Sequence, residues 1–168
     1  MIDLALAKAH VRAEGCAEDA LIELYIEAAQ ALVEGQTGNL LTRREVTQEL
    51  DRFGGHVPLW WGPNPSGIVI DYVDGGAIAR TVSGPRVVRD RVYPPVGGWP
   101  MSLEASPVVV TYQAGYAEGA APADFDQAQL MLVAHWYLNR EAVTSGNAAS
   151  EVPLAVEAII RRHRPVLI

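Results

Sequence analysis

The residues whose side chains could do covalent or acid-base chemistry are few and widely spaced. The chain has one cysteine, Cys16, and four histidines. A thiol near a helix start can act as a nucleophile, but it also needs a positioned base, and the sequence places no histidine beside Cys16. One cysteine cannot form an internal disulfide, and scattered histidines do not form a zinc cluster. We therefore predict no catalytic thiol and no metal site.

Two histidines have a polar neighbour at helical spacing. His10 lies four residues before Glu14, and His135 lies four residues before Asn139. Residues four apart share one face of a helix, so these pairs are typical of hydrogen bonds on a helix surface or at an interface. We interpret neither pair as an acid-base pair.

Motifs for nucleotide binding and for serine catalysis are absent from the sequence. The Gly-Gly steps at 54–55, 75–76 and 97–98 match neither a dinucleotide-binding loop nor a Walker loop, and no Gly-x-Ser-x-Gly elbow occurs. Asp124 and Asp126 stand at a predicted helix start, where carboxylates complement the helix dipole. We predict no catalytic residue and no cofactor, and hence no enzyme.

Three tryptophans, Trp60, Trp61 and Trp99, fall within one region of the chain. Aromatic rings could form a ligand cage or a stacking platform, but they are more often large apolar core or interface residues. We favour the core or subunit-contact interpretation. A small-molecule-binding module that uses these rings stays open as an alternative.

Composition and charge limit the class of protein. The chain has 168 residues, 49% of them hydrophobic, which suits a single domain with its own core. A net charge of −7 disfavours a surface that grips nucleic acid, because such affinity comes from Lys and Arg neutralising phosphates. The longest apolar stretch, 130–138, is too short for a bilayer, and the N-terminus has no signal pattern. We expect a protein made in a reducing cytoplasm that contacts no membrane.

Helical sequence brackets the chain at both ends. Asp3 is the expected N-cap of a short helix that ends at Gly15, and a longer helix from about residue 17 meets breakers at Gly35 and Gly38. Helix returns over residues 124–142, apolar nearly all round, after Pro122 in a first-turn position. Pro153 opens a last helix.

Between these ends the apolar pattern changes to a period of two, which predicts strands. Residues 46–50, 68–72 and 108–112 alternate, and the Asp-Gly-Gly step at 74–76 predicts a tight hairpin. The predicted fold is therefore α+β: a small helical bundle, 1–38 and 122–164, with an antiparallel β-rich insertion at about 40–115. We expect all of 1–168 to form one domain with a C-terminal tail at 161–168.

The two ends of the chain resemble the head-tail connector, or adaptor, family of tailed bacteriophages and related gene transfer agents. The runs that carry the resemblance are Leu-Ala-Leu-Ala-Lys-Ala-His-Val-Arg at 4–12, Glu-Asp-Ala-Leu-Ile at 18–22, residues 28–38 with their closing Thr-Gly, Pro-Ala-Asp at 122–124, the segment 127–141 with its His-Trp-Tyr-Leu-Asn-Arg-Glu, and Val-Pro-Leu-Ala-Val at 152–156. The β-rich region resembles only a subset of such proteins.

The resemblance implies a structural virion protein with no active site. Family members form a ring, commonly of twelve subunits, that sits in the neck between the portal and the tail and passes DNA through its lumen. The implied partners are other copies of the chain, the portal, and stopper or tail proteins. DNA would pass without specific binding.

Two surfaces are candidates for these contacts. The early turns of the second helix carry an acidic set that could line the channel and repel the DNA backbone: Glu18, Asp19, Glu23 and Glu27. The C-terminal segment is placed by position where the family docks on the portal: Arg161, Arg162, His163, Arg164, Val166, Leu167 and Ile168. The alternatives are another neck protein, such as a stopper or tail-completion protein, or a binding or enzymatic domain that uses the β-rich insertion.

Overall fold

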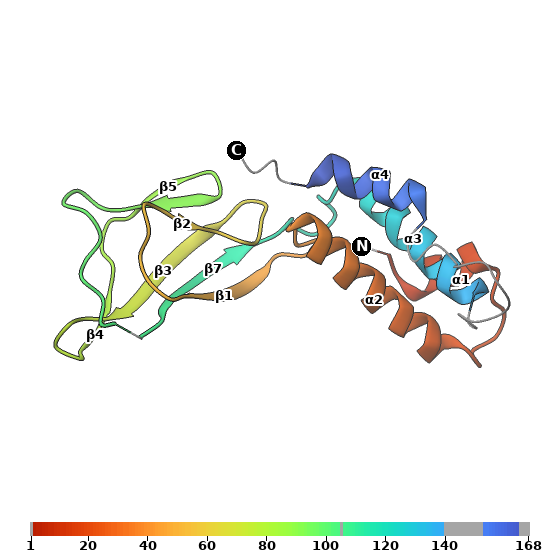
Figure 1. Cartoon of the computed structure of the whole chain (residues 1–168). Helices are drawn as coiled ribbons and strands as arrows, with labels where there is room; N and C mark the ends of the chain where they lie inside the picture. Colours follow the sequence, from red (N-terminus) through yellow and green to blue (C-terminus); the bar gives the residue numbers. More distant parts are fainter. Residues whose placement is uncertain (1, 105, 140–152, 165–168) are drawn as a thin grey trace, which may run out of the picture. The chain divides into compact units, whose positions relative to one another are not determined.

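The fold is α+β, as predicted. The computed structural model describes residues 2–104, 106–139 and 153–164 (Figure 1). Four helices and seven strands occur within this described part of the chain. They form two compact units: residues 1–41 with 119–168 make a helical unit, and residues 42–118 make a β unit.

The first helix, α1 (Leu4–Val11), begins where the sequence predicted and ends earlier. The Asp3 carboxylate accepts a hydrogen bond of 2.7 Å from the backbone N–H of Leu6, which is the expected N-cap. Arg12, not Gly15, ends the helix. It adopts the left-handed conformation (φ 56°) and its N–H bonds the Lys8 carbonyl.

The second helix, α2 (Asp19–Thr37), is longer than its glycines suggested. Gly35 lies inside the helix, where it costs stability without breaking the hydrogen-bond ladder. Gly38 ends the helix in the left-handed conformation (φ 67°), with its N–H donating to the Glu34 carbonyl. The prediction of a stop at Gly35 was wrong, and the stop at Gly38 is confirmed.

The other two helices are α3 (Ala123–Leu138) and α4 (Leu154–His163), and Pro122 and Pro153 are their N-cap residues. Because α3 contacts each of the other three helices, its nearly all-apolar sequence is explained by its place in the bundle. The helix ends at Leu138 with Asn139 as its C-cap, short of the predicted residue 142, and residues 140–142 lie outside the described part of the chain. Fully buried side chains of the bundle include Ala7, Ile22, Ala29, Val33, Phe125, Leu132 and Val156.

The β unit consists of two antiparallel sheets. The larger sheet has the strand order β1-β7-β3-β4 and the smaller one β2-β6-β5. The strands are β1 (Arg44–Leu50), β2 (Val57–Pro58), β3 (Ser66–Val73), β4 (Ala79–Thr81), β5 (Arg86–Val88), β6 (Arg91–Tyr93) and β7 (Val108–Ala114). The turn from Asp74 to Ala77 joins β3 to β4, which confirms the predicted hairpin.

A polar cluster joins the small sheet to the inner face of the large one. The Gln48 side chain on β1 donates a hydrogen bond of 2.6 Å to the carbonyl of Pro58 on β2. It also accepts a hydrogen bond of 3.0 Å from the Tyr112 hydroxyl on β7. That hydroxyl in turn accepts the backbone N–H of Trp61 at 3.0 Å. Burial raises the pKa of Tyr112 above its ordinary value. The buried polar atoms of this cluster therefore have partners, and they hold the two layers in register.

Candidate assembly surfaces

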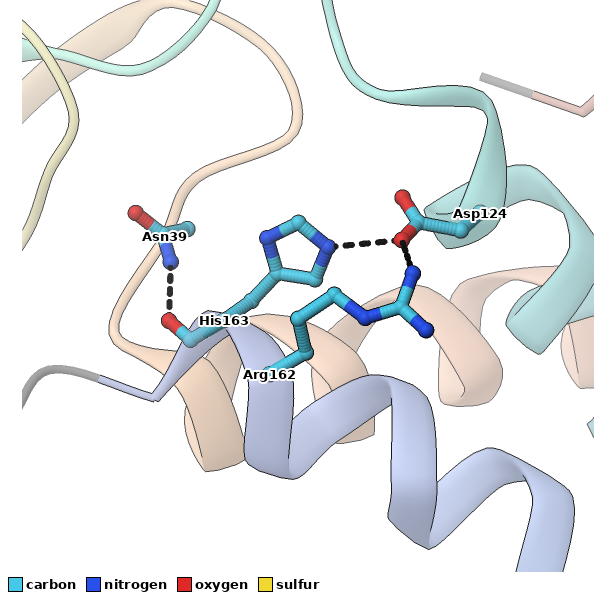
Figure 2. A network of polar contacts seen from close by, with 4 residues as sticks. All are labelled: Asn39, Asp124, Arg162 and His163. Carbon is cyan, nitrogen blue, oxygen red and sulfur yellow. Dashed lines mark hydrogen bonds and ion pairs between the residues drawn. The ribbon is translucent and has the colours of Figure 1, made fainter.

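A polar network fastens the end of α4 to the bundle (Figure 2). The His163 Nε2 atom, in the last turn of α4, lies 2.8 Å from Oδ2 of Asp124 in the first turn of α3. Arg162 Nη1 reaches the same oxygen at 3.3 Å, and Asn39 Nδ2 donates 3.0 Å to the His163 carbonyl. Residues far apart in the sequence thus meet at one end of the helical unit.

The Asp124 carboxylate does more than complement the α3 dipole. Its hydrogen bond with His163, followed by the charges of His163 and Arg162, lowers the pKa of Asp124 against the opposing effect of burial. The His163 ring also lies against Phe125, with ring centroids 4.3 Å apart. Sequence reasoning missed this pairing, because no local pattern links residues 39 positions apart.

The structure describes four of the seven residues predicted to dock on the portal: Arg161, Arg162, His163 and Arg164. The Arg161 side chain is 76% exposed and pairs with Glu157 at 3.2 Å, and the Arg162 side chain is 70% exposed. The Arg164 Nη2 atom donates 2.5 Å to Oε1 of Gln36 on α2. Val166, Leu167 and Ile168 lie outside the described residues.

The predicted acidic face divides into two parts. Glu18 accepts a hydrogen bond of 2.5 Å from the Tyr137 hydroxyl, and Asp19 forms an ion pair of 2.5 Å with Lys8. Both carboxylates therefore stabilise contacts inside the helical unit. Glu23 and Glu27 are exposed, so only these two of the set project into solvent from the face of α2.

The three tryptophans have different surroundings. Trp60 is 53% exposed, whereas Trp61 is half-buried beside Tyr112. Trp99 stacks on Phe53, with centroids 4.8 Å apart and planes inclined by 10°. Because Trp60 and Trp61 do not line the cleft that Trp99 lines, the three rings do not form one cage.

The cleft beside Trp99 has a volume of about 800 Å³. Phe53, Met101, Leu103 and Glu104 are among its other lining residues. The indole Nε1 atom of Trp99 is buried without a hydrogen-bond partner in the described part of the chain. This volume is large enough for a small molecule.

The remaining sequence candidates are the two histidine pairs and Cys16. Glu14 lies beyond the end of α1, so the predicted pair with His10 is not a helical one. The second pair is confirmed: the Asn139 amide nitrogen donates 2.7 Å to the His135 carbonyl. Cys16 is exposed ahead of α2. Across the described residues, no group of three potential metal ligands occurs and no helix could span a membrane.

The chain is similar over nearly its whole length to chains from particle necks. One comes from the neck of an empty gene transfer agent (GTA) particle computed with C6 symmetry: it is 28% identical, with a TM-score of 0.79 over 99% of this chain and 91% of that one. A chain from the neck of the native GTA particle computed with C12 symmetry is also 28% identical, with a TM-score of 0.73 over 100% and 94% of the two chains.

A third similar chain belongs to the virion of the native GTA particle, at 27% identity and a TM-score of 0.76 over 99% of this chain and 91% of that one. The likeness supports a structural protein of a particle neck. The likeness also disfavours an enzyme. The matched part of the chain includes the β unit as well as the helices. No protein-family model and no curated protein sequence matches the chain.

Proposed function

We propose that this chain is a head-tail connector, or adaptor, subunit. In this proposal copies of the chain, twelve in number, form a ring in the virion neck between the portal and the tail, and DNA passes through the ring. The observation that carries the proposal is the likeness to GTA neck chains over 99% or more of this chain, one of them computed with C12 symmetry. The whole chain, 1–168, acts as one connector domain made in the host cytoplasm, and it performs no catalysis.

Charge favours DNA passage over DNA binding. A net charge of −7 on every copy gives the ring a field that repels phosphates, and lysine and arginine are absent between Arg12 and Arg43, a stretch that includes all of α2. We assign channel lining to the acidic set Glu18, Asp19, Glu23 and Glu27, with the exposed Glu23 and Glu27 facing the DNA. Reversal of both charges should slow DNA passage through assembled particles, and unchanged passage would contradict this assignment.

We assign portal docking to the segment 161–168. Its exposed Arg161 and Arg162 lie at the end of α4, and the network around Asp124 holds that end against α3. Exposed guanidinium groups are well suited to acidic partner surfaces because they donate several hydrogen bonds in a fixed geometry. The apolar residues Val166, Leu167 and Ile168 would add buried area to the same contact.

Sedimentation with purified portal rings tests the proposal. The unaltered chain should co-sediment with the portal, and the double variant Arg161→Glu with Arg162→Glu should bind at least about tenfold more weakly. A matched control, Arg52→Glu with Arg12→Glu, changes the net charge equally at exposed sites outside the segment and should bind normally. A portal that binds neither the chain nor its assemblies would contradict the connector assignment.

Two other functions remain candidates. A stopper or tail-completion protein would also sit in a particle neck, and it would bind below the connector instead of on the portal. The cleft beside Trp99 favours a small-molecule-binding or enzymatic domain, since it combines a lining of apolar and polar side chains with an unpartnered indole N–H. Specific quenching of tryptophan fluorescence by one compound of a ligand screen would support that role.

A further inference from the structure

The large sheet of the β unit exposes an acidic face. Side chains alternate along a strand, so every second residue of β1, β3 and β7 lies on the side opposite the core. Glu49, Val109 and Asp71 are neighbours in register across these three strands. The acidic outer face is defined by Glu45, Glu49, Val69, Asp71, Val109 and Thr111.

This face holds three carboxylates, and no Lys or Arg of the large sheet shares it. The Asp71 carboxylate accepts a hydrogen bond of 2.5 Å from the Thr81 hydroxyl, and the Glu45 carboxylate accepts one of 3.4 Å from the Gln113 amide nitrogen. Neither partner is a cation, so these two hydrogen bonds leave the negative charge of the face in place. At its centre Val69 is 43% exposed.

The small sheet presents the opposite charge. Its β5–β6 hairpin pairs Val88 with Arg91, which places these two side chains and that of Arg86 on one side. Arg89 stands in the connecting turn with φ 56°. Val88 is 55% exposed, and Arg86 and Arg89 are exposed without an ion pair in the described part of the chain. The basic hairpin is defined by Arg86, Val88, Arg89 and Arg91, and the exposed Asp90 in its turn is its one carboxylate.

The two charged surfaces lie on opposite sides of the β unit. The small sheet covers the inner face of the large one, as the Gln48 bond to Pro58 and the fully buried Val57 and Val92 show. The acidic outer face and the basic hairpin therefore cannot neutralise each other within one copy.

We propose that the acidic outer face of one copy binds the basic hairpin of the next copy, in a head-to-tail contact repeated around the ring. This inference rests on the ring of the proposed function. Different surfaces on the two sides of one subunit are what a heterologous, closing interface requires. The exposed Val69 and Val88 supply an apolar centre, and the arginines supply charge-assisted hydrogen bonds to the carboxylates.

Three variants of the full chain test this contact. The first reverses the acidic outer face (Glu49→Lys with Asp71→Lys), the second reverses the basic hairpin (Arg86→Glu with Arg89→Glu), and the third carries all four changes. Each single-face variant brings like charges together, so the protein concentration at half-assembly should rise at least about tenfold at low salt. The third variant restores opposite charges and should assemble as the unaltered chain does.

Mixing the two single-face variants is the sharper experiment. In a ring of alternating copies, each reversed surface meets a surface of opposite charge, so the mixture should assemble where neither variant does alone. Native mass spectrometry distinguishes such alternating rings by mass. Rescue by mixing also shows that both variants are folded, because a misfolded chain could not assemble.

The control for the acidic-face variant is the double charge reversal Glu104→Lys with Glu118→Lys. Both positions are exposed on the β unit and lie outside the acidic outer face. This control should assemble normally. Assembly of a single-face variant at the unaltered concentration would overturn the proposed contact and leave the ring intact, pointing to a tail protein as the occupant of these surfaces. Failure of the unaltered chain to assemble, with or without a portal ring, would instead overturn the proposed function together with the contact.

Discussion

The hydrogen bond between Asp124 and His163 should contribute measurably to the stability of the helical unit. The 2.8 Å contact joins side chains that are 26% and 20% exposed, so solvent screens it only in part. A partly buried hydrogen bond to a charged group contributes about 1–2 kcal/mol. Arg162 reaches the same carboxylate at 3.3 Å but is 70% exposed, and an exposed pair contributes no more than about 0.5 kcal/mol.

A double-mutant cycle separates the two partners. The cycle combines Asp124→Asn with His163→Gln, and a second cycle combines Asp124→Asn with Arg162→Gln. Urea unfolding followed by circular dichroism at the helix band reports the helical unit, since the β unit contributes little there. We expect a coupling energy of about 1 kcal/mol for the histidine and less than about 0.5 kcal/mol for the arginine. A coupling to Arg162 that equals or exceeds the coupling to His163 would refute the reasoning.

The same interaction predicts a pH dependence. The pKa of Asp124 is lowered in the folded state from its ordinary value of 3.8, so the unfolded chain binds this proton more readily. The stabilisation is therefore complete above the unfolded pKa and is lost as the pH falls through the lowered folded value. The difference in free energy of unfolding between the unaltered chain and Asp124→Asn should shrink as the pH falls through 3.8 and below. A difference that grows on acidification would contradict the assigned cause.

Two further substitutions, with Gly55→Ala as a control, probe the β unit and the packing inside it. Gly115 has φ 113°, and an added Cβ would lie 2.5 Å from the Thr42 carbonyl oxygen. The substitution Gly115→Ala should therefore lower the free energy of unfolding by about 2–4 kcal/mol. The control Gly55→Ala adds a Cβ that meets open space and should change the free energy of unfolding by less than about 1 kcal/mol. Tyr112→Phe removes the donor to Gln48 and should cost about 1–2 kcal/mol, and amide hydrogen exchange at Trp61, whose N–H loses its acceptor, should speed up.

Periodicity predicted α2 and β7 because each of them buries one face. The helical spacing in α2 and the alternation in β7 are local patterns, and the Asp3 cap and the hairpin at 74–76 depend on neighbouring residues only. The small sheet could not be predicted, because its strands are two or three residues long and leave almost no period to detect.

The candidate surfaces were predictable in part. Composition identified the acidic stretch of α2 and the basic end of α4, but it could not show that Glu18 and Asp19 are engaged by Tyr137 and Lys8. It also could not place Asp124 against the end of α4, because that contact is made by the tertiary fold. The charged faces of the β unit depend on strand register, which the sequence does not reveal across long connections.

Native mass spectrometry of the purified chain over a concentration series, with and without a portal ring, tests the connector assignment most directly. The proposed function predicts a closed assembly of twelve copies, formed alone or on the portal. A chain that stays monomeric at every concentration and does not bind the portal would contradict it.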